Sequence, residues 1–115
     1  MRKVLIVDDS HLLQTRLKKA LIEVDKNMSV SQAANCKEAT ELFTSFEPGT
    51  MILDIELPDG SGIDLLRKIK EDNPSVNVII FTNYPTNEFK KSCMELGANH
   101  FIDKSELFSL INLFR

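Results

Sequence analysis

Five polar side chains that could form one reactive site follow short hydrophobic or mixed segments of this 115-residue chain. They are Asp8, Asp9, Asp54, Thr82 and Lys104. Three carboxylates share a small site only if a cation offsets their repulsion, and Mg²⁺ binds a few carboxylates together with water and phosphate oxygens. A lysine adds a compact positive charge, and a threonine adds a hydroxyl donor for a phosphate oxygen. This set therefore indicates phosphoryl transfer to an ionised aspartate, with catalysis by positioning and charge neutralisation.

Three continuous hydrophobic runs predict the central strands that would position these residues. The runs are Val4–Val7, Met51–Leu53 and Val78–Phe81. Uninterrupted runs of this length are typical of strands buried on both faces of a parallel sheet. Two weaker and more mixed segments, 30–33 and 99–102, predict edge strands.

Hydrophobic residues at helical spacing lie between and after these segments and predict five helices. The stripes are Leu13, Leu17, Leu21 and Val24; Ala39, Leu42, Phe43 and Phe46; Leu65, Leu66 and Ile69; Phe89, Cys93 and Leu96; and Leu107, Leu110, Ile111 and Phe114. We interpret each stripe as a core-facing surface. Residues 58–62, rich in proline and glycine, predict a turn-rich loop before the third helix.

The alternation of strands and helices predicts an α/β fold. Right-handed crossovers between parallel strands place helices on both faces of a sheet. We expect a flavodoxin-like (βα)5 three-layer sandwich with a five-stranded parallel sheet in the order 2-1-3-4-5. In such a sheet the carboxyl ends of all strands lie at one edge, beside the switch between the first and third strands. Asp8, Asp9 and Asp54 follow these two strands, so they should converge there with Thr82 and Lys104.

Composition narrows the functional class. The formal net charge is −3, from 14 basic and 17 acidic residues, whereas a nucleic-acid-binding surface would be basic. No hydrophobic run approaches the ~20 residues of a membrane span, and no secretory signal is evident. Cys36 and Cys93 fall within predicted helices and have no metal-ligand spacing. We therefore expect one domain over residues 1–115, in the cytoplasm, without membrane or nucleic-acid contact.

Four segments carry a resemblance to a known family. They are VLIVDDS at 4–10, MILDIELPDGSG at 51–62, IIFTN at 79–83 and FIDKS at 101–105. Each is weak alone, but all four occur in order on the expected elements. Over essentially its whole length, the chain resembles the receiver domain of two-component response regulators, the CheY-like family.

The resemblance implies a role for each residue of the acidic site. Asp54 corresponds to the phosphoacceptor, and Lys104 to the lysine that contacts the phosphate. Asp9 corresponds to a direct Mg²⁺ ligand, and Asp8 to a second acidic partner acting through water. The backbone carbonyl of Glu56 corresponds to a further metal ligand. No organic cofactor is implied.

The resemblance also implies a partner and a switch. The phosphoryl donor would be a phosphohistidine of a sensor histidine kinase or phosphotransfer protein. Thr82 would then bond the phosphate, and Phe101 would turn inward into the space that Thr82 leaves. The signal would appear on the fourth helix, fifth strand and fifth helix, for an effector or a homodimer. The chain would be no independent enzyme, since it would only phosphorylate and dephosphorylate itself, and it would contain no effector domain.

One departure and two alternatives accompany this interpretation. Ser105 follows Lys104 where the family most often has proline, and we expect the family's cis peptide here, although non-proline cis bonds cost ~2.5–4 kcal/mol. A phosphate-independent interaction module is one alternative, but the complete acid, threonine and lysine set argues against it. The Asp54-Ile55-Glu56 triplet faintly resembles haloacid-dehalogenase-like phosphatases, which place the nucleophile after the first strand and need more chain. Neither GxGxxG nor a Walker A motif is present.

Overall fold

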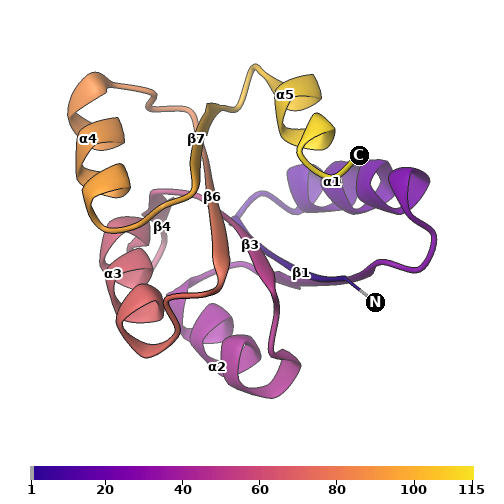
Figure 1. Ribbon diagram of the computed structural model, residues 1–115, viewed down its shortest axis with the longest axis horizontal. Coiled ribbons are helices and arrows are strands. Elements are labelled where there is room, and N and C mark those ends of the chain that lie inside the picture. Colours follow the sequence, from indigo (N-terminus) through magenta and orange to yellow (C-terminus); the bar gives the residue numbers. More distant parts are fainter. Residues whose placement is uncertain (1) are drawn as a thin grey trace.

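Five parallel strands form the central sheet of the computed structural model, which describes residues 2–115 (Figure 1). The strands are β1 Lys3–Val7, β2 Ser29–Ala33, β3 Thr50–Leu53, β6 Asn77–Thr82 and β7 His100–Asp103. Their order is β2-β1-β3-β6-β7, with β2 and β7 at the edges. The flavodoxin-like fold and the predicted order are confirmed, because β6 and β7 are the fourth and fifth strands of this sheet.

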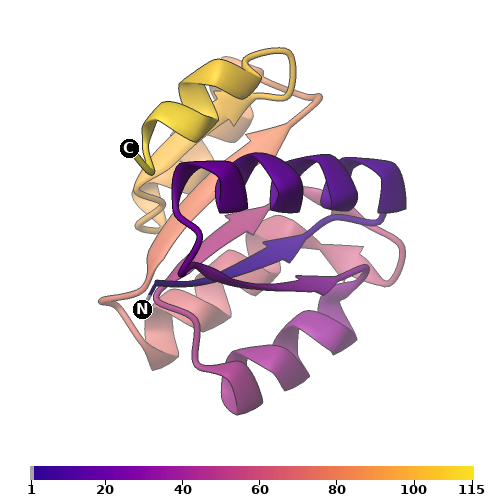
Figure 2. The same cartoon turned by 90° about the vertical axis from the view of Figure 1, so that its right-hand side faces the viewer.

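Five helices cover the two faces of the sheet (Figures 1 and 2). They are α1 His11–Val24, α2 Cys36–Phe46, α3 Gly62–Asp72, α4 Asn87–Glu95 and α5 Leu107–Asn112. Side chains at the starts of α1, α2 and α4 accept the backbone N–H of the first turn, as N-caps do. The helix α3 ends before Asn73-Pro74, since a residue preceding proline disfavours helical geometry.

The continuous hydrophobic runs divide between two cores because successive side chains of a strand point to opposite faces. In β1, Leu5 and Val7 pack beneath α2, α3 and α4, whereas Val4 and Ile6 pack beneath α1 and α5. The runs in β3 and β6 alternate in the same way. Both faces of these strands are therefore buried, which explains why their sequences are hydrophobic without interruption.

A two-stranded hairpin occupies the segment after β3, where the sequence predicted a turn-rich loop. Its strands are β4 Glu56–Leu57 and β5 Gly60–Ser61. Asp59, in the turn, accepts hydrogen bonds from the backbone N–H groups of Cys36 (2.7 Å) and Lys37 (3.0 Å) at the start of α2. These bonds, led by the one from Cys36, lower the pKa of Asp59. The hairpin is thus anchored to a neighbouring helix.

Gly62 starts α3 directly against the backbone at the end of β3. A Cβ at this position would overlap the carbonyl oxygen of Asp54 and lie 2.9 Å from its carbonyl carbon. We expect Gly62→Ala to lower the free energy of unfolding by at least ~2 kcal/mol, because backbone atoms cannot move aside cheaply. Denaturant unfolding measures this change. Gly49→Ala is the matched control, since a Cβ there meets nothing within 4 Å. Equal stabilities of the two variants would contradict the argument.

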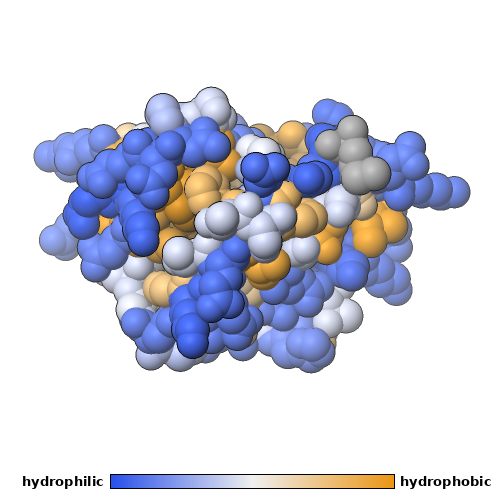
Figure 3. Space-filling model, turned by 90° about the horizontal axis from the view of Figure 1, so that it is seen from below, coloured by the Kyte–Doolittle hydropathy of each residue, from blue (hydrophilic) through white to orange (hydrophobic). Residues whose placement is uncertain are grey.

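The surface is mixed in character. Viewed from below, hydrophobic side chains are visible in patches separated by hydrophilic ones (Figure 3). None of the helices between residues 2 and 115 has the length and hydrophobicity that a membrane crossing requires.

Candidate functional site

The acidic residues after β1 and β3 converge at the carboxyl edge of the sheet, as predicted. One carboxylate oxygen from each of Asp8, Asp9 and Asp54 lies within 4.8 Å of the others. Asp8 and Asp54 are buried, at 3% and 6% exposure, whereas Asp9 is exposed. Pairing of β1 with β3 places Val7 beside Leu53, so the residue after each strand reaches the same level of the sheet. The convergence therefore follows from strand register.

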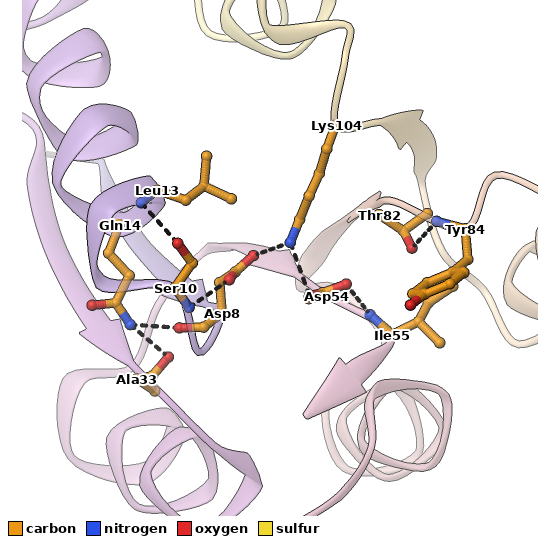
Figure 4. Close-up of polar contacts among 10 residues, drawn as sticks. All are labelled: Asp8, Ser10, Leu13, Gln14, Ala33, Asp54, Ile55, Thr82, Tyr84 and Lys104. Atoms are coloured by element: carbon orange, nitrogen blue, oxygen red, sulfur yellow. Dashed lines mark hydrogen bonds and ion pairs between the residues drawn. The ribbon is translucent and has the colours of Figure 1, made fainter. Parts of the chain in front are cut away.

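Lys104 lies between the two buried carboxylates (Figure 4). Its Nζ is 2.7 Å from Asp8 Oδ2 and 2.9 Å from Asp54 Oδ2. Its backbone N–H donates to the carbonyl of Thr82 at 2.8 Å, which ties the residue after β7 to the end of β6. The lysine therefore neutralises part of the charge at the site from a fixed backbone position.

The expected cis peptide between Lys104 and Ser105 is wrong. Residues 2–115 contain no cis peptide bond, so this bond is trans. Without proline, the trans form is favoured by ~2.5–4 kcal/mol. From this trans backbone the lysine reaches both carboxylates.

The remaining contacts of the two buried carboxylates are with nearby backbone. Asp8 Oδ1 accepts the N–H of Ser10 at 2.9 Å, and Asp54 Oδ1 accepts the N–H of Ile55 at 2.8 Å. Gln14 also contacts this region, donating from Nε2 to the carbonyls of Asp8 and Ala33 (Figure 4). The sequence analysis missed Gln14. The available signal was a polar residue three positions before Leu17, on the hydrophobic side of α1.

Burial and charge act in opposite directions on the site's ionisation. Burial raises the pKa of Asp54, and the hydrogen bond and charge of Lys104 only partly offset this, while the Asp8 carboxylate raises it further. Burial lowers the pKa of Lys104, but the contacts with Asp8 and Asp54 outweigh burial, so its pKa is raised overall. The lysine therefore stays protonated beside carboxylates whose charge is incompletely neutralised.

A cavity of about 370 Å³ opens directly onto this group. Its lining is predominantly polar: Asp8, Asp9, Ser10, Asp54, Glu56, Leu57, Pro58, Asn83, Tyr84 and Lys104. Another cavity, of about 600 Å³ between α1 and α5, is larger but has a mainly hydrophobic lining with only Glu23 and Arg115 charged. Chemistry, not size, therefore identifies the candidate site.

Of the other predicted residues, Glu56 lines this cavity, whereas Thr82 and Phe101 do not. Thr82 is fully buried, and its hydroxyl oxygen accepts the N–H of Tyr84 at 2.9 Å (Figure 4). Glu56 is exposed in β4 and lines the cavity. Phe101 is partly buried in β7 and packs against the core beneath α2, α3 and α4. The structure thus brings Asp8, Asp9, Asp54 and Lys104 together, whereas the hydroxyl of Thr82 bonds to Tyr84 and the ring of Phe101 packs against the core.

The donor set fits a hard divalent cation. All three acidic side chains offer carboxylate oxygens, and their three negative charges exceed the one positive charge of Lys104. An open cavity on the same side leaves room for water and phosphate oxygens, which such cations retain as ligands.

Comparisons with known proteins agree with this geometry. The sequence matches the response regulator receiver domain family over residues 4–112. It is 36% identical over 105 residues to the transcriptional regulatory protein YdfI of Bacillus subtilis, covering 90% of this chain and 48% of YdfI. It is 30% identical over 103 residues to the chemotaxis protein CheY of Halobacterium salinarum, covering 90% of this chain and 84% of CheY.

Solved structures show the same fold. The receiver domain of a DNA-binding response regulator from Colwellia psychrerythraea superposes with a TM-score of 0.92 at 21% identity, covering 98% of this chain and 94% of the other. Several curated relatives are much longer, and this chain spans about half or less of their length.

The family match covers nearly the whole chain, and the acidic cluster lies where the fold brings the ends of β1 and β3 together. Receiver domains typically bind a divalent metal in such an acidic pocket. They act in signalling as acceptors of a phosphoryl group. This protein therefore belongs to the CheY-like response regulator receiver family and acts in two-component signalling.

Proposed function

We propose that Asp54 accepts the phosphoryl group from a phosphohistidine, with Mg²⁺ held by Asp8, Asp9, Asp54 and the backbone carbonyl of Glu56. The observation that carries this proposal is the arrangement of three acids and Lys104 around one open cavity. Asp9 would bind the ion directly, and Asp8 through water. The donor would be a sensor histidine kinase or a phosphotransfer protein.

The transfer is an in-line displacement at phosphorus. A carboxylate oxygen of Asp54 forms the new O–P bond while the N–P bond to the donor histidine breaks. The electron pair of the N–P bond stays on the imidazole nitrogen. The donor side chain leaves as neutral histidine once that nitrogen is protonated. Asp54 needs no general base because it attacks as a carboxylate. When bound, Mg²⁺ neutralises charge on the carboxylates and the phosphoryl oxygens.

The residues around Asp54 fix its direction and compensate its charge. The N–H of Ile55 and the ammonium of Lys104 hold the two carboxylate oxygens, at 2.8 and 2.9 Å. This leaves the side chain little freedom before the donor arrives. After transfer, the ammonium of Lys104 is positioned to pair with a phosphate oxygen.

The switch would pass through Thr82 and Phe101. The hydroxyl oxygen of Thr82 accepts from Tyr84, so its proton is available to donate to a phosphate oxygen. That movement would open space for the partly buried ring of Phe101 to turn inward. A new local charge can bias two pre-existing arrangements in this way. The surface of α4, β7 and α5 would then change for an effector or a second copy, in the cytoplasm.

Incubation of the protein with Mg²⁺ and a small phosphodonor tests the proposal. We expect a mass increase of one phosphoryl group, which is lost on treatment with hydroxylamine because the product is an acyl phosphate. Removal of divalent cations with EDTA should abolish the increase, and added Mg²⁺ should restore it. A protein that gains no phosphoryl group under these conditions, or gains it equally in EDTA, would refute the proposal.

A further inference from the structure

Gln14 is a polar residue on the buried side of α1. Only 5% of its surface is exposed to solvent, and it lies on the same side of the helix as the buried residues Leu17 and Leu21. Its Nε2 donates to the carbonyl of Asp8 at 2.6 Å and to the carbonyl of Ala33 at 3.2 Å (Figure 4). A hydrophobic residue would satisfy the packing of this helix face. The amide must therefore have a role other than packing, and its hydrogen bonds reach the ends of β1 and β2.

The contact with Asp8 fixes a peptide group that leads into the acidic site. The carbonyl of Asp8 and the nitrogen of Asp9 belong to one planar peptide unit. Holding the carbonyl therefore sets the direction in which the chain enters Asp9. Asp9 is exposed, so tertiary packing constrains its carboxylate less than those of Asp8 and Asp54.

Asp8 is held at each of its polar groups. Its N–H donates to the carbonyl of Ala33 at 3.0 Å, and its two carboxylate oxygens accept from the N–H of Ser10 and from Lys104. The remaining polar group of Asp8, its backbone carbonyl, accepts the hydrogen bond from Gln14. Because Gln14 also reaches Ala33, it joins the same two residues that the backbone bond joins. The peptide between Asp8 and Asp9 is thereby locked to the edge of the sheet.

We propose that Gln14 is a positioning residue for the cation site, which directs the carboxylates of Asp8 and Asp9 toward Asp54 by holding the peptide that joins them. This inference rests on the proposed function, because it concerns the metal of that site. Groups that orient metal ligands typically change metal affinity by 10–100-fold when they are removed. Gln14 acts through the ligands and does not touch the cation.

Gln14→Met tests this role, because methionine has a similar shape and no N–H donor. We expect the Kd for Mg²⁺ to rise roughly 10-fold. The intrinsic emission of Tyr84 reports binding, since it is the one tyrosine of a chain without tryptophan and it lines the cavity. The Mg²⁺ concentration for half-maximal phosphorylation should rise in parallel, while the maximal phosphorylation rate at saturating Mg²⁺ should be unchanged.

Leu21→Val is the matched control, since it reduces packing of the same helix away from Asp8. We expect it to lower stability and leave the Kd for Mg²⁺ unchanged. The inference is overturned if folded Gln14→Met binds Mg²⁺ as the wild type does, or if Leu21→Val weakens binding equally. If the wild type itself fails to bind Mg²⁺ or to be phosphorylated, the proposed function fails instead.

A measurement on the wild-type protein keeps the inference testable if Gln14→Met does not fold. The chain has two glutamines, Gln14 and Gln32, so their side-chain amide resonances are readily assigned by NMR. Addition of Mg²⁺ should shift the amide resonances of Gln14 and leave those of Gln32 in place. Unchanged Gln14 resonances at saturating Mg²⁺ would overturn the inference.

Discussion

Asp54→Asn should reduce phosphorylation by a small phosphodonor at least ~1000-fold, because it removes the attacking oxygen anion. Mass spectrometry of the intact protein, with Mg²⁺ and phosphodonor in excess, measures this loss. The amide of asparagine has nearly the shape of the carboxylate, and its oxygen can still accept the N–H of Ile55. The substitution therefore removes the nucleophile with little change in packing.

The folded state of this variant should remain intact. Burial raises the pKa of Asp54, so its ionised form is disfavoured by folding, and a neutral amide avoids that cost. We therefore expect a thermal unfolding midpoint no lower than that of the wild type. Asp64→Asn is the matched control, since this exposed α3 carboxylate pairs only with Arg67 among residues 2–115. Equal phosphorylation of wild type and Asp54→Asn would eliminate Asp54 as the acceptor.

Lys104→Met should both destabilise the Mg²⁺-free protein and suppress phosphorylation. Removal of this cation leaves the buried carboxylates of Asp8 and Asp54 facing each other without compensation. Loss of one partner of a buried ion pair typically costs about 3–5 kcal/mol, and we expect ~3 kcal/mol here because the cavity admits water. Denaturant unfolding in EDTA measures the difference.

Mg²⁺ should recover much of the stability lost by Lys104→Met, because a divalent cation can compensate the same carboxylates. A ligand that binds the folded state stabilises it by RT ln(1 + [L]/Kd), so a tighter site gains more. The gain on adding Mg²⁺ should thus be larger for the variant than for the wild type. Phosphorylation should stay slow even at saturating Mg²⁺, since the ammonium that would pair with the phosphate is missing.

Lys70→Met provides the matched comparison. Lys70 is also a partly buried lysine, but its Nζ donates to neutral acceptors, the carbonyl of Val76 at 2.6 Å and Asn99 Oδ1 at 2.9 Å. Its loss should lower stability to the same extent with and without Mg²⁺. If Lys104→Met were insensitive to Mg²⁺ as well, the charge compensation assigned to Lys104 would be incorrect.

The sequence by itself determined the fold and the edge of the sheet at which the site lies. Uninterrupted runs such as Val4–Val7 require burial on both faces, and parallel strands separated by helices place their carboxyl ends together. Acids directly after β1 and β3 therefore had to converge. These conclusions depend on local patterns and on topology, so they need no knowledge of how side chains pack.

Tertiary structure alone decided which atoms meet at that edge. Lys104 pairs with Asp8 as well as Asp54, because the direction of its long side chain is settled by packing. The hairpin anchored by Asp59 and the contact from Gln14 to the end of β2 join segments distant in sequence, and local patterns do not specify such partners. Thr82 is similarly a strand-end residue by sequence, but only the structure shows that its hydroxyl oxygen accepts the N–H of Tyr84 (Figure 4).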